Sequence, residues 1–293
     1  MSRRTLPPFE YFEPNSLDEC VSLMSSFGKE GAVLAGGTDL IVLMRDRVIA
    51  PKYIVNLSKI PGMEYIREDE EGLKIGALTK IVSLEKSFEI KGKYPALWEA
   101  AHSLGSTQVR NLATIGGNLC RASPSGDMCC SLLGLDAKVK IFGKGGFRIV
   151  PIESFFKGPG ATALQKDEIL TEVIVPRGPL SESSAFIKIS RTKIDLAQIN
   201  ATVALNMADG ICKDIRISIG AVAPTPIRAK NAEKLLIGKE IRTGEEKIVN
   251  EASEIAAGET KPITDVRATA DWRRKVSKVI VKRAIRTALR RVK

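Results

Sequence analysis

The stretch LATIGGNLCRASPSGDM, residues 112–128, organises the fold of this 293-residue chain. A short apolar run leads into the adjacent glycines Gly116 and Gly117, and a polar bend that contains a proline follows them. Glycine has no Cβ and can adopt positive φ, so such a pair lets backbone N–H groups converge on an anion. Thr114 and Asn118 flank the pair and can add side-chain hydrogen bonds to the same ligand.

A second glycine stretch, VLAGGTDL at residues 33–40, has the same character and leads into an apolar, helix-like run to Met44. Thr38 or Asp39 can cap that helix, whose free N–H groups would then face the glycine turn. Two anion-binding loops on one chain suit a diphosphate held between them. Each stretch taken alone also fits an ordinary tight turn, because glycine pairs are frequent turn signals.

Taken together, AGGTDL (35–40) and RNLATIGGNLCRASPSGD (110–127) resemble the FAD-binding subunit of the molybdenum hydroxylases. That family includes the flavin subunits of xanthine dehydrogenase and of aerobic carbon monoxide dehydrogenase. Three later segments also resemble it: DEILTEVIVP (167–176), FIKISRTKIDLAQINATVAL (186–205) and IGAVAPTPIRAKNAEKLL (219–236). The resemblance therefore extends over nearly the whole chain. It implies a PCMH-type, two-lobed FAD-binding domain followed by a small α+β C-terminal domain.

The resemblance also implies which residues bind FAD. Asp127 would accept a ligand hydroxyl or N–H, although a local Asx turn with Ser125 and Gly126 is the alternative. Leu170 and Lys188 align with residues beside the isoalloxazine ring, where a lysine suits the negative charge of the reduced flavin. Lys188 also fits an ordinary exposed strand position. The diphosphate and ribityl chain would lie along Val33, Leu34, Ala35, Gly36, Gly37, Thr38, Asp39, Leu40, Thr114, Ile115, Gly116, Gly117 and Asn118.

The N-terminal pattern predicts a small, largely parallel α/β lobe. Strands are expected at 9–12, 32–35 and 53–57, with a helix at 17–27 and another from the first glycine stretch to about Val48. The chain contains neither G-x-G-x-x-G in this lobe nor G-x-x-x-x-G-K-[ST] anywhere. The sequence therefore supports no Rossmann or P-loop assignment.

The remaining segments predict a second lobe and a C-terminal domain of mixed α+β class. The domains are expected at 1–177, with lobes at about 1–57 and 58–177, and at 184–293. Strands are expected at 63–66 and 72–75 around an acidic turn at 68–71, at 138–142 and 147–152, and at 171–175, 185–189, 201–207 and 215–219. Helices are expected from about 81, at 94–105, at 245–257 and at 271–290. The last helix has an apolar stripe formed by Val276, Val279, Ile280, Ile285 and Leu289.

Net charge is +11, and ten Lys or Arg residues without an acid lie between Trp272 and Lys293. Such a run is typical of nucleic-acid binding, of a solvated helix face or of docking on an acidic partner. No aromatic residues interleave with the charges, so nucleic acid is not expected. No apolar run approaches the ~20 residues of a membrane span. Ser2-Arg3-Arg4 lacks a following apolar segment, so an export signal is rejected and a cytoplasmic location is expected.

Five cysteines and one histidine limit the chemistry of the chain. Cys120, Cys129 and Cys130 gather near the second glycine stretch, but the cysteines form no zinc spacing, and buried free thiols are favoured over a metal or iron–sulfur site. One branch of the family carries an extra cluster in a cysteine-bearing insert, which this chain lacks. His102 lies within an apparent helix, where a structural role is favoured over catalysis.

The resemblance implies an oxidoreductase function as the medium subunit of a hetero-oligomeric molybdenum hydroxylase. Electrons would pass from a large molybdenum subunit through iron–sulfur clusters of a small subunit to the FAD of this chain. NAD, a quinone, ferredoxin or oxygen would be the terminal acceptor. No catalytic residue and no molybdenum or cluster ligand is assigned to this chain. A self-sufficient FAD-dependent oxidase of the same broad fold and a non-enzymatic basic binding module are the alternatives.

Overall fold

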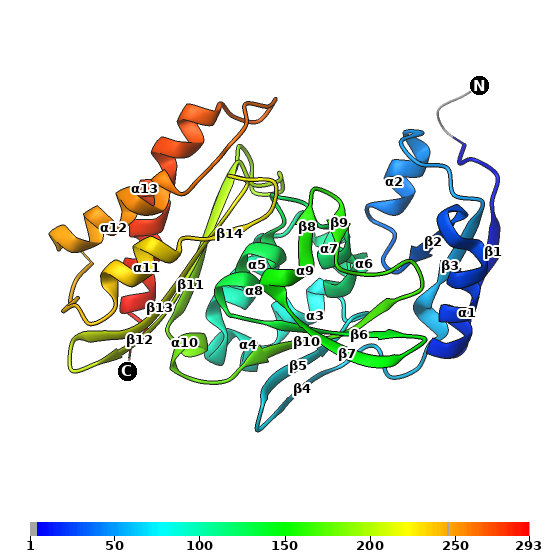
Figure 1. The fold of residues 1–293 in the computed structure, drawn as a ribbon, viewed down its shortest axis with the longest axis horizontal. Coiled ribbons are helices and arrows are strands. Elements are labelled where there is room, and N and C mark those ends of the chain that lie inside the picture. Colours follow the sequence, from blue (N-terminus) through cyan, green and yellow to red (C-terminus); the bar gives the residue numbers. More distant parts are fainter. Residues whose placement is uncertain (1–4, 245, 293) are drawn as a thin grey trace.

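The computed structural model describes residues 5–244 and 246–292. Three sheet-containing parts follow one another along the long axis of the molecule: a small N-terminal lobe, a central lobe and a C-terminal domain (Figure 1). This arrangement confirms the predicted mixed class, with an α/β N-terminal lobe. The Ser2-Arg3-Arg4 stretch lies outside the described residues. Among the residues that the structure does describe, no helix has the length and apolar character needed to cross a membrane.

The N-terminal lobe is a three-stranded parallel sheet with the order β1-β3-β2. The helix predicted at 17–27 is confirmed. Ser16 caps it by accepting a hydrogen bond from the Glu19 N–H, and apolar side chains at helical spacing are buried. The second helix ends at Arg45 rather than near Val48, since Arg47 takes a left-handed conformation with φ 60°. The elements are β1 (Glu10–Phe12), α1 (Leu17–Phe27), η1 (Gly28–Glu30), β2 (Gly31–Leu34), α2 (Leu40–Arg45), β3 (Tyr53–Asn56) and η2 (Leu57–Lys59).

The central lobe contains a five-stranded antiparallel sheet, and helices pack on it (Figure 1). The sheet order is β4-β5-β10-β6-β7. Its strands are β4 (Ile66–Asp69), β5 (Gly72–Gly76), β6 (Lys138–Gly143), β7 (Gly146–Pro151) and β10 (Ile169–Pro176), and a separate pair is β8 (Phe156–Gly158) with β9 (Ala161–Thr162). Its helices are α3 (Ile81–Lys86), α4 (Phe88–Lys93), α5 (Pro95–Ser103), α6 (Thr107–Leu112), α7 (Ile115–Arg121), α8 (Asp127–Gly134) and α9 (Ile152–Phe155).

Strand β4 corrects the prediction for this lobe. A strand was expected at 63–66, but β4 begins at Ile66, and Glu68 and Asp69 belong to it. The acidic turn is therefore reduced to its last two residues, Glu70 and Glu71. Met63 is buried in the core and its carbonyl accepts the Leu78 N–H, so it packs as a connecting segment rather than as a strand.

The C-terminal domain is a four-stranded antiparallel sheet with helices α11, α12 and α13 along one side (Figure 1). The apolar stripe predicted for the last helix is confirmed only in part, because Ile280 and Ile285 are buried whereas Val279 is 44% exposed. Helix α11 was not anticipated. The elements are α10 (Pro179–Glu182), β11 (Ser184–Ile189), β12 (Ile199–Ala208), β13 (Ile211–Gly220), β14 (Ile227–Arg228), α11 (Lys230–Leu236), α12 (Lys247–Gly258) and α13 (Ala270–Leu289).

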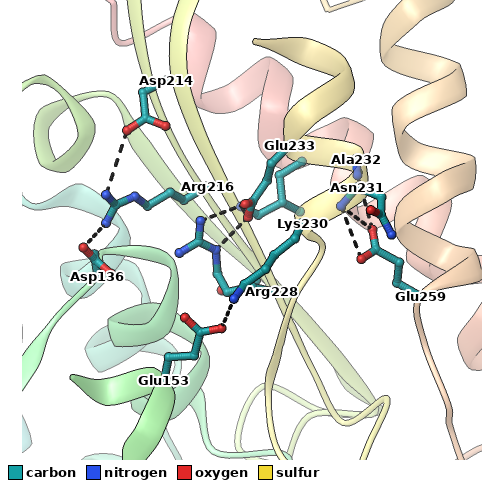
Figure 2. A network of polar contacts seen from close by, with 12 residues as sticks. Asp136, Glu153, Asp214, Arg216, Arg228, Lys230, Asn231, Ala232, Glu233 and Glu259 are labelled. Carbon is teal, nitrogen blue, oxygen red and sulfur yellow. Dashed lines mark hydrogen bonds and ion pairs between the residues drawn. The ribbon is translucent and has the colours of Figure 1, made fainter. Parts of the chain in front are cut away.

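Polar side chains join the C-terminal domain to the central lobe at both ends of their contact. At one end Arg291 forms an ion pair of 2.5 Å with Glu99 of α5, which also accepts the Phe186 N–H. At the other end Lys230 pairs with Glu153 at 2.5 Å (Figure 2). Between them Ser218 donates to the carbonyl of Cys130 on α8. These contacts hold the C-terminal sheet in a defined position against α5 and α8.

The network in Figure 2 also contains a buried ion pair within the C-terminal domain. Glu233 of α11 accepts two hydrogen bonds from the Arg228 guanidinium at 2.6 and 2.8 Å and a third from the Ile217 N–H at 2.7 Å. Both side chains are almost entirely buried. This carboxylate therefore fixes α11 to the middle of strand β13.

Replacing Glu233 with alanine should destabilise the protein strongly, because Arg228 would remain buried without its counter-charge. We expect the free energy of unfolding to fall by about 3 kcal/mol. Glu153→Ala is the matched control, since it removes an exposed ion pair of the same network and should cost less than about 1 kcal/mol. Urea unfolding followed by circular dichroism measures both. Equal effects would show that the buried pair contributes no more than the exposed one.

Candidate functional site

A cavity of about 620 Å³ lies where the N-terminal lobe, the central lobe and the C-terminal domain meet. Its walls come from the loop between β2 and α2, helix α7, the bend before α8, strand β10 and the loop between β11 and β12. This volume falls within the ~300–1,000 Å³ of small-molecule sites. Fourteen of the sixteen residues predicted to bind the cofactor line it: Val33, Ala35, Gly36, Gly37, Thr38, Asp39, Leu40, Thr114, Gly116, Gly117, Asn118, Asp127, Leu170 and Lys188.

The other two predicted residues do not line the cavity. Ile115 is fully buried in the hydrophobic core of the central lobe. Leu34 is the last residue of β2 and does not line the cavity, whereas the alternate residues Val33 and Ala35 do. Successive side chains of a strand point to opposite faces, so a contiguous run of residues cannot all face one ligand.

The loop between β2 and α2 lines the cavity and contains a row of unbonded backbone donors. Within residues 5–244 and 246–292, no acceptor bonds the backbone N–H of Gly36, Gly37, Thr38 or Asp39. Gly37 has φ +72°, a conformation that favours glycine. A Cβ at Gly36 would lie 2.1 Å from the Leu112 carbonyl oxygen, so only glycine allows this approach. The loop can therefore offer several N–H groups to one anion.

The second glycine pair behaves differently from the prediction. Gly116 and Gly117 lie in the first turn of α7, and neither has positive φ. Their N–H groups are already bonded, to the Ala77 carbonyl at 2.9 Å and to Thr114 Oγ1 at 3.1 Å. The prediction of an open anion loop is therefore wrong here, because Thr114 acts as an N-cap and starts a helix. At Gly116 the missing Cβ allows close packing, since an added one would lie 2.7 Å from the Ala77 carbonyl oxygen.

Asp127 and Lys188 form a buried ion pair at the junction of the two domains. Lys188 Nζ lies 2.8 Å from one carboxylate oxygen and also donates to the Ser103 carbonyl at 2.9 Å. Asn200 donates to the other carboxylate oxygen at 2.9 Å. Burial raises the pKa of Asp127, and the ammonium of Lys188 opposes that rise. Lys188 is buried, so it does not occupy an ordinary exposed strand position. Asp127 makes long-range hydrogen bonds instead of a local Asx turn.

Several cavity residues were missed by reasoning from the sequence. Arg121 pairs with Asp39 across the cavity, with Nε and Oδ1 3.3 Å apart. Arg267 and the apolar side chains of Ile194 and Leu196 come from two loops of the C-terminal domain. Arg121 lies within the motif that was singled out, but its partner is 82 residues away, and no local signal shows this pairing.

The cysteines and the histidine have structural environments. Cys129 and Cys130 are fully buried, and burial raises the pKa of the Cys130 thiol to about 12. In the part of the chain that the structure covers, no three His, Cys, Asp or Glu side chains group as metal ligands would. His102 stacks on Trp98 with ring centroids 5.0 Å apart, and its Nδ1 lies 2.9 Å from Glu85. The predicted structural role of His102 agrees with this placement.

Comparison with known proteins identifies the family. Residues 7–178 match the family model described as the FAD binding domain in molybdopterin dehydrogenase. Residues 184–288 match that of the CO dehydrogenase flavoprotein C-terminal domain.

Individual relatives agree along the full length. The carbon monoxide dehydrogenase medium chain of Hydrogenophaga pseudoflava is 32% identical over 96% of this chain and 97% of its own length. The glyceraldehyde dehydrogenase medium chain of Sulfolobus acidocaldarius is 30% identical over 96% and 98%. The solved carbon monoxide dehydrogenase from Hydrogenophaga pseudoflava, in a form that lacks the Mo-pyranopterin moiety, superimposes with a TM-score of 0.94 over 99% of this chain and 100% of its own. The chain therefore belongs to the FAD-binding subunits of the molybdenum hydroxylases, a family of oxidoreductases, and its cofactor is FAD.

The close approach at Gly36 predicts that Gly36→Ala impairs FAD binding. The added methyl group would collide with the Leu112 carbonyl and displace the row of unbonded N–H groups. We expect FAD affinity to fall at least about tenfold, or ~1.4 kcal/mol. Titration of the flavin-free protein by quenching of flavin fluorescence measures this loss. Gly145→Ala is the control, because a Cβ there meets no atom within 4 Å; equal affinities of the two variants would contradict the prediction.

Proposed function

We propose that this chain is the electron-transfer subunit of a multisubunit molybdenum hydroxylase. A large molybdenum-containing subunit supplies electrons to the iron–sulfur clusters of a small partner subunit. This chain receives the electrons from those clusters. It passes them to a terminal acceptor: NAD, a quinone, ferredoxin or oxygen. The name medium chain, which several relatives bear, supports such an assembly. The observation that carries the proposal is the large cavity with a row of unbonded backbone N–H groups along one wall.

The residues of the cavity fit FAD. The N–H groups of Gly36, Gly37, Thr38 and Asp39 would hold the diphosphate, since consecutive backbone donors bind phosphate without a side chain. Thr114, which caps α7, and Gly117 and Asn118 on α7 would contact the ribityl chain. The glycine at 36 lets the loop lie against Leu112, which keeps these donors close to α7.

The buried pair of Asp127 and Lys188 would set the electrostatics of the flavin end of the cavity. Bound FAD supplies the capacity to take up and release two electrons. Lys188 holds a positive charge at the cavity wall, where it favours negative charge on a neighbouring ligand. Its hydrogen bonds to Asp127 and Ser103 orient the ammonium group. Leu170, from β10, provides an apolar contact surface on the same cavity.

Two hydrophobic cores support the division into domains at 1–177 and 184–293. One core spans both lobes of the first part and takes in Phe186 and Ala204 of the C-terminal sheet, and the other lies between that sheet and helices α11, α12 and α13. In this proposal the first domain carries the donors for FAD, and the second completes the cavity with Lys188 and two loops.

The donor row of Gly36, Gly37, Thr38 and Asp39, together with the size of the cavity, predicts selectivity for FAD over FMN. FMN lacks the second phosphate and the adenosine, so it would leave part of the cavity and part of the donor row unused. We expect FMN to bind at least about 100-fold more weakly, or ~2.7 kcal/mol. Fluorescence titration of the flavin-free protein with each flavin provides the measurement. Similar affinities for both would mean that the donor row does not bind a diphosphate.

The proposed division of labour predicts the behaviour of the isolated subunit. Loaded with FAD, it should accept electrons from dithionite but leave aldehydes and purines unoxidised. Adding the small and large subunits should restore reduction of the flavin by the substrate, which is followed as bleaching of its absorbance. Turnover of an organic substrate by the isolated chain at ~1 per second or more would favour a self-sufficient oxidase instead.

A further inference from the structure

We propose that Arg121 is a side-chain ligand of the FAD diphosphate and that Asp39 holds its guanidinium in place when no anion is bound. Arg121 is the last residue of α7, and Asp39 directly precedes α2. Both line the cavity, and each comes from a different lobe. The inference rests on the proposed flavin site and adds a charged group to its backbone donors.

Of the cationic side chains that line the cavity, Arg121, Lys188 and Arg267, Arg121 makes the longest polar contact. Lys188 donates to a carboxylate and a carbonyl, and Arg267 pairs with Asp265 at 3.1 Å. Within residues 5–244 and 246–292, Arg121 donates only through Nε, to Asp39 at 3.3 Å. Charge-assisted hydrogen bonds are usually ~2.7–2.9 Å long, so this contact is a loose one. A guanidinium has five N–H donors, so four remain available for a ligand.

The position of Asp39 explains why such a cation is needed. The Asp39 carboxylate belongs to the same four-residue segment that lines the cavity and whose N–H groups are unbonded. A diphosphate held there would approach a negative side chain, and like charges a few ångströms apart repel. Arg121 offsets that charge from across the cavity. Guanidinium groups bind phosphate with two parallel hydrogen bonds, which a single long contact to Asp39 does not match.

This arrangement assigns opposite effects to the two partners of one ion pair. Arg121 attracts the diphosphate, whereas Asp39 repels it and competes for the guanidinium. A pair that merely fastens the two lobes together would instead make both residues favourable for ligand binding. The sign of the Asp39 effect therefore separates the two roles.

The test compares ADP, which carries the diphosphate half of FAD, with riboflavin, which carries no phosphate. Isothermal titration of the flavin-free protein at low salt would give both affinities. We expect Arg121→Gln to lower the affinity for ADP and for FAD about tenfold and to leave the affinity for riboflavin unchanged. Asp39→Asn should strengthen ADP binding about threefold. The double variant should bind ADP more tightly than Arg121→Gln alone.

Controls keep the outcomes distinct. Arg274→Gln and Asp271→Asn disrupt a comparable exposed ion pair on α13 and should leave ADP affinity unchanged. Arg121→Lys keeps the charge and should retain more affinity than Arg121→Gln, and thermal melting reports whether each variant is folded. Loss of ADP binding in Asp39→Asn as large as in Arg121→Gln would overturn the proposal, as would unchanged ADP binding in Arg121→Gln. Failure of the unaltered protein to bind FAD would instead refute the proposed flavin site.

Discussion

The buried charge of Asp127 is the constraint on which the two-domain arrangement depends. A carboxylate that is removed from water requires compensating partners, and the price of leaving it unpaired is several kcal/mol. The ammonium and amide that compensate it, Lys188 and Asn200, both belong to the C-terminal sheet. The central lobe therefore cannot bury the start of α8 in a favourable state until the second domain docks. The same docking completes the wall of the cavity. The interaction that stabilises the domain contact therefore also determines the shape of the site.

A second constraint joins the N-terminal lobe to the rest of the cavity. Gly36 brings the loop after β2 against the Leu112 carbonyl at the end of α6. Helix α7 begins three residues later, at Ile115, and Gly116 brings it against the Ala77 carbonyl beside β5. At both positions the absence of a Cβ allows two backbone segments from different parts of the chain to pack closely together. Gly36 and Gly116 therefore determine how closely the segments around the cavity approach one another.

Reasoning from sequence was most accurate where local signals and burial agree. Helix α1 combines the Ser16 cap with regular apolar spacing, and the hairpin of β6 and β7 follows from two alternating segments around a glycine turn. The Gly116–Gly117 pair was misjudged, because glycine disfavours a helix by about 1 kcal/mol per residue, and here the Thr114 cap and packing against Ala77 outweigh that cost. Which cavity residues meet across the lobes was not predictable, since Arg121 and Asp39 pair through tertiary structure alone.

The ion pair between Arg291 and Glu99 has a consequence for how the protein is made. Glu99 leaves the ribosome long before Arg291, and the two meet only when the end of helix α13 has been synthesised. Domains generally fold in order of synthesis. The face of α5 and α8 that the C-terminal sheet covers therefore stays exposed until the C-terminal domain has been translated. Chaperone binding to that exposed face would compete with the intramolecular docking that completes the cavity.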